Sequence, residues 1–561
     1  MKILVVGGGA REHAILWKLR QSALVSKLFV TPGNAGMEQL AECVSLDDDH
    51  PDAASYADLA ERLVVDLTVI GPENLLVEGL VDHFQQRGLR VFGPTAAAAR
   101  LEGSKIWAKE VMQRVGIPTA SWRAFSEFDD ALSHAHDLEW RCAIKADGLA
   151  SGKGSFVCKT VEEVTEALHL LLTEKRFGNK PVIVEELLDG QEVSVFALSD
   201  GRTVVPFGAA QDHKRARDRD EGPNTGGMGA YSPVNHMKVA QDFAGSFFQP
   251  IVNDLSALKT PYVGVLYAGA IVTAQGPKIL EFNCRFGDPE AEVLLCRLDG
   301  DLAEILWAAT ECNLHKLAAP GWKSKDALCV VISTEKYPQE ADFGTQIYGV
   351  EEAGKVEDVI VFHAGTSRDP TSQELVTHGG RILSVTGMGN SLEEARTRAY
   401  KAVEKIHFEG MYFRKDIASK ADGIVWETEW RKPPRWERQV MGASLAIGRV
   451  ANNLEKAQFE VGGDTSSDVA AQIQTAREEL YEIKLTLSPG QSSVPITDRS
   501  GDDEDSSDAA SRLSSLSAEF DALLERMQSP EARLAVDAVF RASPKELGAV
   551  SGAPKANRRR E

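Results

Sequence analysis

Residues 278 to 289 read Lys278-Ile-Leu-Glu-Phe-Asn-Cys-Arg-Phe-Gly-Asp-Pro289, and the rest of the chain is best interpreted from this stretch. Its apolar start predicts a strand. Because strand side chains alternate, Glu281 and Asn283 share one face. Leu280 and Phe282 then point to the other face. Two oxygen-bearing side chains about 6.7 Å apart along the backbone suit a hard cation such as Mg²⁺. The alternative is a strand-end carboxylate that faces water.

Length and composition favour a multidomain globular protein. The chain has 561 residues, of which 43% are hydrophobic and 26% charged, so several domains are expected. A net charge of -21 disfavours nucleic acid as a partner, and any phosphate site must be a local cationic pocket. Seven cysteines without a Cys-x-x-Cys pair favour reduced thiols. With no signal peptide or membrane-length segment, we expect a cytoplasmic protein that contacts no membrane.

The first hundred residues have the pattern of an α/β unit. Residues 3–6 predict a buried strand, the glycines at 7–9 a tight turn, and residues 10–20 a helix. Further strands are expected at 28–31, 67–70 and 90–92. A glycine turn before a helix suits a phosphate. Position 12 is Glu rather than the third glycine of a dinucleotide fingerprint, which weakens the case for nicotinamide binding. Nicotinamide binding and a turn used only for packing are the two alternatives.

From about residue 103 the pattern becomes mixed. A helix is expected at 104–115, followed by strand-rich lobes with few crossovers; their strands are expected at 142–145, 156–159, 182–185, 192–198 and 263–273. Residues 327–420 predict a further small α+β domain. Its strands are expected at 327–332, 359–363 and 381–386, and its helix at 392–406.

The remainder of the chain predicts helices on a tether. Three apolar stripes with spacings of three and four residues begin at Val440, Val469 and Leu513, as in amphipathic helices. A linker rich in Ser, Gly and Asp, residues 488–508, separates the last two. Such faces cannot stay exposed, so the stripes pair with themselves, with a partner protein, or with the rest of the chain.

Two stretches predict a nucleotide site. Residues 144–154, Ile-Lys-Ala-Asp-Gly-Leu-Ala-Ser-Gly-Lys-Gly, place Lys145 at a strand end and Lys153 in a glycine-rich loop, where both can meet phosphate oxygens. The alternative is a hairpin turn with exposed lysines. Residues 182–192, Val-Ile-Val-Glu-Glu-Leu-Leu-Asp-Gly-Gln-Glu, form an apolar strand that runs into acids. Its exposed backbone suits an adenine edge and Glu192 suits ribose hydroxyls, whereas solvated acids are the alternative.

A third region predicts a substrate loop. Asp212-His-Lys-Arg215 is followed by Gly222-Pro-Asn-Thr-Gly-Gly-Met-Gly-Ala-Tyr231. Four glycines in eight residues cost conformational entropy that a simple connector does not need. A loop shaped to approach a ligand closely is the better interpretation.

These motifs, with Gly7-Gly-Gly-Ala-Arg-Glu-His-Ala14, Gly93-Pro-Thr95 and Glu102-Gly-Ser-Lys105, resemble the phosphoribosylamine-glycine ligase family of the ATP-grasp superfamily. The resemblance runs from residue 1 to about 417. It implies an α/β and α+β multidomain fold. The expected parts are a Rossmann-like pre-ATP-grasp domain (1–102), a two-lobed ATP-grasp module (103–325, small lobe about 120–190), a small α+β C-terminal domain (326–420) and a helical, partly disordered extension (421–561).

The resemblance also implies a reaction. ATP phosphorylates glycine to glycyl phosphate, and the amine of 5-phosphoribosylamine displaces phosphate to give glycinamide ribonucleotide in purine biosynthesis. Mg²⁺, with Mn²⁺ as a substitute, would bind Glu281 and Asn283. Rival hypotheses are a related ligase with a different amine and a nicotinamide-binding protein. One departure from the family is Glu335-Lys-Tyr-Pro338, where glycines usually precede Tyr-Pro.

Residue roles follow from the same resemblance. Catalytic roles are expected for Arg285, Lys153, Asp212 and Lys214, with a structural salt bridge from Arg285 to Asp288 as the alternative. ATP would contact Lys105, Lys145, Gly152, Lys153, Glu185, Glu186, Leu188 and Glu192. Glycine and 5-phosphoribosylamine would contact Gly9, Arg11, Asp212, Lys214, Thr225, Gly226, Gly227 and Arg285.

Overall fold

The structure is a computed structural model that describes residues 1–46, 51–150, 153–234, 243–419 and 421. The three apolar stripes, the linker at 488–508 and Gly152 lie outside the described residues. Within these residues, no helix combines the length and apolarity needed to span a membrane.

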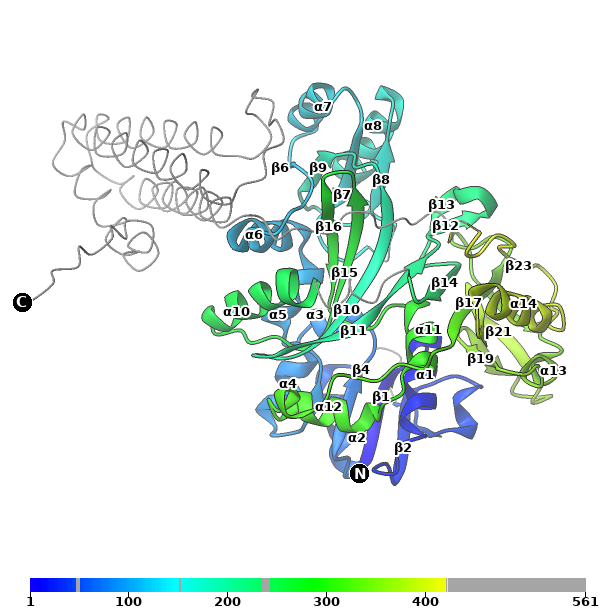
Figure 1. Ribbon diagram of the computed structural model, residues 1–561. Helices are drawn as coiled ribbons and strands as arrows, with labels where there is room; N and C mark the ends of the chain where they lie inside the picture. Colours follow the sequence, from blue (N-terminus) through cyan, green and yellow to red (C-terminus); the bar gives the residue numbers. More distant parts are fainter. Residues whose placement is uncertain (47–50, 151–152, 235–242, 420, 422–561) are drawn as a thin grey trace, which may run out of the picture. The chain divides into compact units, whose positions relative to one another are not determined.

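A parallel sheet forms the N-terminal part, which is blue in Figure 1. Its strands are β1 (Lys2–Gly7), β2 (Lys27–Pro32), β3 (Glu42–Cys43), β4 (Leu67–Ile70) and β5 (Val91–Phe92). They pair in the order β3-β2-β1-β4-β5, all parallel. The helices are α1 (Ala10–Leu19), α2 (Ala53–Leu63), α3 (Glu73–Val77) and α4 (Leu80–Gln86).

The burial of β1 explains this arrangement. Ile3 to Val6 are at most 1% exposed, as expected for a parallel strand covered on both faces. The predicted α/β unit is therefore confirmed. The strand order reverses between β1 and β4, and a crevice outside the carboxyl ends of such strands is where open α/β sheets bind ligands. The turns at 7–9 and 71–73 lie there.

A four-stranded antiparallel sheet forms the small lobe. It contains β6 (Trp122–Phe125), β7 (Cys142–Ala146), β8 (Ser155–Cys158) and β9 (Val182–Glu186), in the order β6-β9-β7-β8. The helices α7 (Phe128–Asp137) and α8 (Val161–Leu168) share one apolar core with it. This core leaves the opposite face of β7 for the buried side chain of Lys145.

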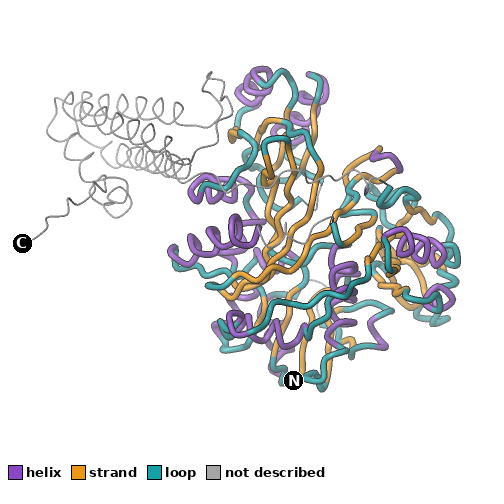
Figure 2. Tube along the Cα trace, viewed as in Figure 1, coloured by secondary structure: helices purple, strands orange, loops and turns teal. Residues whose placement is uncertain are grey.

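A nine-stranded antiparallel sheet is the largest sheet of the described residues. Its strands are β10 (Gln191–Asp200), β11 (Val204–Asp212), β14 (Gly229–Ser232), β15 (Val263–Thr273), β16 (Gly276–Asn283), β17 (Asp326–Thr334), β19 (Val359–His363), β22 (Arg381–Gly389) and β23 (Met411–Phe413). Their order is β16-β15-β10-β11-β14-β17-β22-β19, and β23 pairs with β17. Because β14 pairs with β17, one sheet runs across the predicted boundary at residue 325. The strands are orange in Figure 2.

Smaller elements complete the described chain. Two small sheets contain β12 (Arg215–Arg217), β13 (Glu221–Asn224), β18 (Asp342–Gln346), β20 (Thr366–Arg368) and β21 (Leu375–Gly379). The remaining α-helices are α5 (Ala96–Gly103), α6 (Lys105–Val115), α10 (Gln249–Ala257), α11 (Glu290–Arg297), α12 (Leu302–Thr310), α13 (Val350–Gly354) and α14 (Leu392–Val403). Helix α14 ends three residues before the expected end at 406.

Candidate active site

Strand β16 carries the two predicted metal ligands. Glu281 pairs with Gly269 and Asn283 with Tyr267. The predicted alternation fails at Leu280: the ladder passes from Glu281 directly to Ile279, so Leu280 is the extra residue of a β-bulge. Phe282 is buried as expected, but Leu280 is only partly buried. The bulge leaves the relation between Glu281 and Asn283 unchanged, because both follow it.

Cations surround Glu281. Burial would raise the pKa of this carboxyl, but Lys214, Lys105, Lys145 and Arg285 outweigh that effect and lower it. An ionised carboxylate with an amide oxygen two residues on suits a hard divalent cation. Among the described residues, no group of three or more His, Cys, Asp and Glu side chains forms a metal cluster. Phosphate and water oxygens are the usual further ligands of such a cation.

The three predicted phosphate lysines have different surroundings. Lys105 Nζ donates to the Gly148 carbonyl at 2.9 Å, and Lys145 Nζ to the Leu280 carbonyl at 3.4 Å. Both act electrostatically on Glu281. Lys153 is exposed, and its Nζ donates to the Pro338 carbonyl at 3.0 Å. Two of the three lysines thus act on Glu281 through their charges, and the third contacts the C-terminal domain.

Glu185 is held by lysines on either side. Its carboxylate forms ion pairs with Lys145 and, at 2.5 Å, with Lys109, and both Glu185 and Lys109 have side chains only 2% exposed. Lys109 Nζ also donates to Thr119 Oγ1 at 2.6 Å. The side chain predicted to face ATP therefore positions Lys145. Lys109 was missed, although it lies one helical turn after Lys105, a spacing that puts both on one helix face.

The other residues of the expected adenine edge have exposed or half-buried side chains. Glu186 Oε1 accepts from Lys278 Nζ at 3.0 Å and from the Ser121 amide at 3.0 Å. Leu188 is partly buried. Glu192 forms an ion pair with Lys214 at 2.9 Å.

The end of β11 gathers charged groups from several strands. Burial raises the pKa of Asp212 to about 7; Lys214 opposes this shift, while Glu290 and Glu192 add to it. Glu290 Oε1 accepts from Tyr267 Oη at 2.7 Å and from Ser194 Oγ at 3.0 Å. A carboxyl that titrates near pH 7 suits general base catalysis. The sequence predicted Asp212, Lys214 and Glu192 as site residues, but not Glu290.

Arg285 joins β16 to the N-terminal domain. Its guanidinium lies 3.2 Å from both Glu73 and Glu102. Nη2 also donates to Asn283 Oδ1 at 3.3 Å. The alternative partner, Asp288, instead pairs with Arg381 at 3.1 Å. In this structure Arg285 therefore positions the metal-ligand candidate Asn283.

The N-terminal glycine turn is capped from within. The Gly9 amide donates to Glu12 Oε2 at 2.7 Å. Arg11 is buried, with its Nε 2.6 Å from Glu12 Oε1 and its Nη1 3.2 Å from the Phe286 carbonyl. Glu73 lies 3.7 Å from Arg11, so Glu73 links the turn to Arg285.

The glycine-dense loop is held by residues of the C-terminal domain. Arg381 Nη1 donates to the carbonyls of Gly226 at 2.9 Å and Asp288 at 2.9 Å. The Gly226 amide donates to Tyr337 Oη at 3.1 Å. Gly227 has a φ of +116°, and a Cβ there would lie 2.5 Å from Pro289. Sequence reasoning missed Arg381 and Tyr337, which lie more than a hundred residues away.

The base of the same loop is fixed locally. Thr225 donates to the Lys214 carbonyl through both its amide and its hydroxyl, each at 2.8 Å. The Gly227 amide donates to Thr225 Oγ1 at 3.0 Å. The loop therefore starts beside Lys214.

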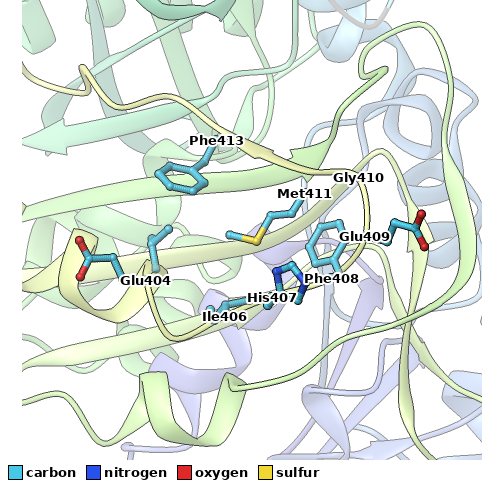
Figure 3. Close-up of a pocket in the computed structure, with 9 residues that line it drawn as sticks. Glu404, Ile406, His407, Phe408, Glu409, Gly410, Met411 and Phe413 are labelled. Atoms are coloured by element: carbon cyan, nitrogen blue, oxygen red, sulfur yellow. The ribbon is translucent and has the colours of Figure 1, made fainter.

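A separate cavity of about 710 Å³ lies in the C-terminal domain, where Met411 lies between Glu404 and Glu409 (Figure 3). None of the predicted site residues lines it.

A small antiparallel lobe and a larger sheet that bring lysines to an ionised glutamate and an amide define an ATP-grasp enzyme. The chain belongs to the phosphoribosylglycinamide synthetase family. It matches the N domain at residues 1–102, the ATP-grasp (A) domain at 103–291 and the C domain at 327–420. The expected family and fold class are confirmed, and the nicotinamide alternative loses its basis. The fold brings with it the use of ATP and a divalent metal.

Curated relatives agree. The phosphoribosylamine–glycine ligase of Caldanaerobacter subterraneus subsp. tengcongensis is 44% identical over 423 residues, which are 75% of this chain and 100% of the relative. That of Escherichia coli K12 is 43% identical over 431 residues, 75% of this chain and 99% of the relative.

Solved structures share the fold. The phosphoribosylamine–glycine ligase of Thermotoga maritima has a TM-score of 0.64 at 31% identity and covers 74% of this chain and 100% of its own. The biotin carboxylase domain of the Hydrogenobacter thermophilus 2-oxoglutarate carboxylase has a TM-score of 0.58 at 16% identity. The match covers 73% of this chain and 91% of that one. At that identity the second likeness concerns the fold alone.

Proposed function

We propose that this chain uses ATP to join glycine to 5-phosphoribosylamine, giving glycinamide ribonucleotide, ADP and phosphate in purine biosynthesis. Family membership and relatives that carry this ligase name support the substrates. The observation that carries the proposal is that the charges of Lys105, Lys145 and Lys214 act together on Glu281 and lower the pKa of its carboxyl. Such a group combines phosphate neutralisation with oxygen ligands in one place.

The phosphoryl-transfer half is assigned to β16 and the lysines. Glu281 and Asn283 would hold Mg²⁺, for which Mn²⁺ can substitute. When bound, the cation offsets negative charge on the phosphate oxygens. Lys105 and Lys145 place further positive charge there, and Lys153 in the glycine-rich loop is assigned as the third phosphate lysine. A glycine carboxylate oxygen attacks the terminal phosphorus, the bond to ADP breaks, and glycyl phosphate forms.

Arg285 is assigned to glycine. A guanidinium has five N–H donors. Within the described residues, three of them donate to Glu73, Phe286 and Asn283, and Nη2 also lies 3.2 Å from Glu102. The second N–H of Nη1 is assigned to the glycine carboxylate or the acyl phosphate.

The ligation half is assigned to the end of β11. The amine nitrogen attacks the carbonyl carbon of glycyl phosphate, the C–O bond to phosphate breaks, and the nitrogen loses a proton. Asp212, with its pKa of about 7, accepts that proton. Lys214 and the loop at Thr225 to Gly227 hold the sugar phosphate, with Gly9 and Arg11 on the N-terminal side.

The test is product formation. The protein is incubated with ATP, Mg²⁺, glycine and freshly generated phosphoribosylamine, and products are identified by mass spectrometry. We expect glycinamide ribonucleotide and ADP in equal amounts, dependent on both substrates. Parallel reactions replace phosphoribosylamine with ammonia or simple primary amines. Equal ADP release with those amines would contradict the proposed substrate.

Two further proposals rest on sequence patterns. A cytoplasmic location follows from the seven cysteines, all of which are free thiols. The apolar stripes of residues 421–561 support self-association or a contact with a partner protein. Truncation after Lys420 followed by light scattering and the ligase assay tests this, since an unchanged mass would contradict self-association.

A further inference from the structure

Two cysteines face each other in the small lobe. Cys142 on β7 lies directly opposite Cys158 on β8 in the antiparallel ladder. Both are buried, at 0% and 1% exposure. They belong to the same apolar core, beneath α7 and α8. Neither has a part in the proposed reaction.

The backbone sets the distance between them. The Ala146 amide donates to the Gly154 carbonyl at 2.8 Å, which marks that pair as a hydrogen-bonded site. Hydrogen-bonded sites recur every second residue, and the ladder has no register shift. Cys142 and Cys158 therefore occupy such a site, with Cα atoms about 5.5 Å apart. Disulfides span about 4.4–6.8 Å between Cα atoms, a range that includes this spacing. The Cβ atoms of a hydrogen-bonded pair lie somewhat farther apart than the about 3.5–4.5 Å of a disulfide, so the bond draws the two strands slightly together. A bond formed with such strain is more easily reduced.

The two thiols also act on each other. Their side-chain interaction lowers the pKa of Cys142 and raises the pKa of Cys158. The Cys158 thiol also donates to the Phe156 carbonyl at 3.9 Å. Cys142 is thus the better nucleophile of the pair, and Cys158 is the group already within its reach. Burial of both groups slows any reagent, but it does not separate the two sulfur atoms.

We propose that Cys142 and Cys158 are a site of reversible oxidative modification, which joins them in a disulfide when a small-molecule disulfide is the oxidant. The Cys142 thiolate attacks one sulfur of the oxidant, forming a mixed disulfide and releasing one thiol. The Cys158 thiolate then displaces the second thiol. The protein loses two protons and two electrons, and the oxidant becomes two thiols.

The position of the bond predicts its effect. Residues 142 and 158 lie on the core face of the hairpin, whereas Lys145 lies on the other face by alternation. The bond therefore lies on the face of the hairpin away from Lys145. It closes a ring around the glycine-rich loop at 147–154, so the expected consequence is a stiffer hairpin.

The test starts from a variant without exposed thiols. Cys43 and Cys312 are the exposed cysteines, and Cys43→Ser/Cys312→Ser prevents bonds between molecules. The folded variant is treated with glutathione disulfide, free thiols are blocked with N-ethylmaleimide under denaturing conditions, and peptides are mapped without reduction. We expect a 142–158 linked peptide pair that dithiothreitol separates.

Two controls make the result decisive. The variants Cys158→Ala and Cys142→Ala must each abolish the linked peptide pair. Two variants are used because one of them can fold poorly. Cys284, Cys296 and Cys329 are also buried. These three must remain free thiols during the oxidation, so that N-ethylmaleimide blocks them afterwards. Hydrogen exchange of residues 142–158 must slow on oxidation and recover on reduction. Full blocking of Cys142 and Cys158 after treatment, or unchanged exchange in the linked form, would overturn the proposal.

Discussion

Asp212 is the residue whose titration bears most directly on the reaction. Because burial raises its pKa to about 7, it is protonated below that pH and accepts a proton from the amine only above it. We expect kcat/KM for phosphoribosylamine to rise through about pH 7. Asp212→Asn should lower activity by about 10²-fold and remove this rise. The measurement is glycine-dependent ADP release at a series of pH values from about 5.5 to about 9, a range that extends well to either side of this pKa.

A matched control is Asp189→Asn in the small lobe, whose side chain is 86% exposed. It should keep the wild-type profile. The same inflection in Asp212→Asn as in the wild type would show that another group titrates.

Glu292 is a residue buried without a partner. It is 0% exposed, and within the described residues neither of its carboxyl oxygens has a hydrogen-bond partner. Burial, followed by the charge of Asp288, raises its pKa well above the ordinary value. The neutral form therefore fits the fold, and the folded protein keeps a proton that the unfolded chain releases.

The sign of the pH effect follows. An acid with a raised pKa in the folded state loses stability as pH rises above its unfolded pKa of about 4.3. Glu292→Gln cannot ionise, so its stability relative to the wild type should increase from pH 5 to pH 8. The midpoints of urea unfolding of both proteins, measured at these two pH values, give this difference in stability. A difference that is constant with pH would contradict an uncharged Glu292.

At the scale of elements, one buried ion triad ties helix α6 to two strands of the small lobe. Lys109 comes from α6, Glu185 from β9 and Lys145 from β7. Burial lowers the pKa of Lys109 to about 8, against the attraction of Glu185. A buried charge of this kind is costly to leave without its partner.

Lys109→Met should therefore lower the free energy of unfolding by about 3 kcal/mol, because Glu185 loses one of its two cations. Lys336→Met is the matched control, since Lys336 pairs with Glu340 on the surface with side chains 70% and 61% exposed. It should cost about 1 kcal/mol or less. Chemical denaturation of both variants gives the comparison, and equal losses would show that the buried triad adds nothing.

Much of the element pattern was predictable from sequence. Strands β4, β15 and β19 begin and end where apolar runs predicted, because a buried strand must be apolar along its length. The bulge at Leu280 could not be predicted from sequence, because an unpaired residue depends on the register of a partner strand and leaves no mark in local alternation.

At the scale of the whole molecule, the C-terminal domain anchors the proposed substrate loop. Arg381 begins β22 and contacts three carbonyls, those of Gly226, Gly227 and Asp288. The candidates of the site could be proposed from sequence because each lies in a local motif. Arg381 and Tyr337 were not, because their role arises only when distant strands join one sheet.

Arg381→Met should raise KM for phosphoribosylamine, because the loop loses its anchor; small misplacements can cost up to about 10²-fold in rate. KM for ATP should change less, since Glu281 and its lysines keep their contacts. Arg368→Met is the control, because Arg368 joins Glu38 through an exposed pair. Steady-state kinetics with each substrate varied gives the split, and equal rises in both KM values would indicate a general loss of structure.

The central claim is that the chain assembles its ATP and metal site around Glu281. The most direct measurement compares Glu281→Gln with the exposed-site control Glu351→Gln in glycine-dependent ATP turnover, with circular dichroism to confirm folding. We expect the first to lose about 10²- to 10³-fold and the second nothing. Turnover in Glu281→Gln equal to that of the control would contradict the claim.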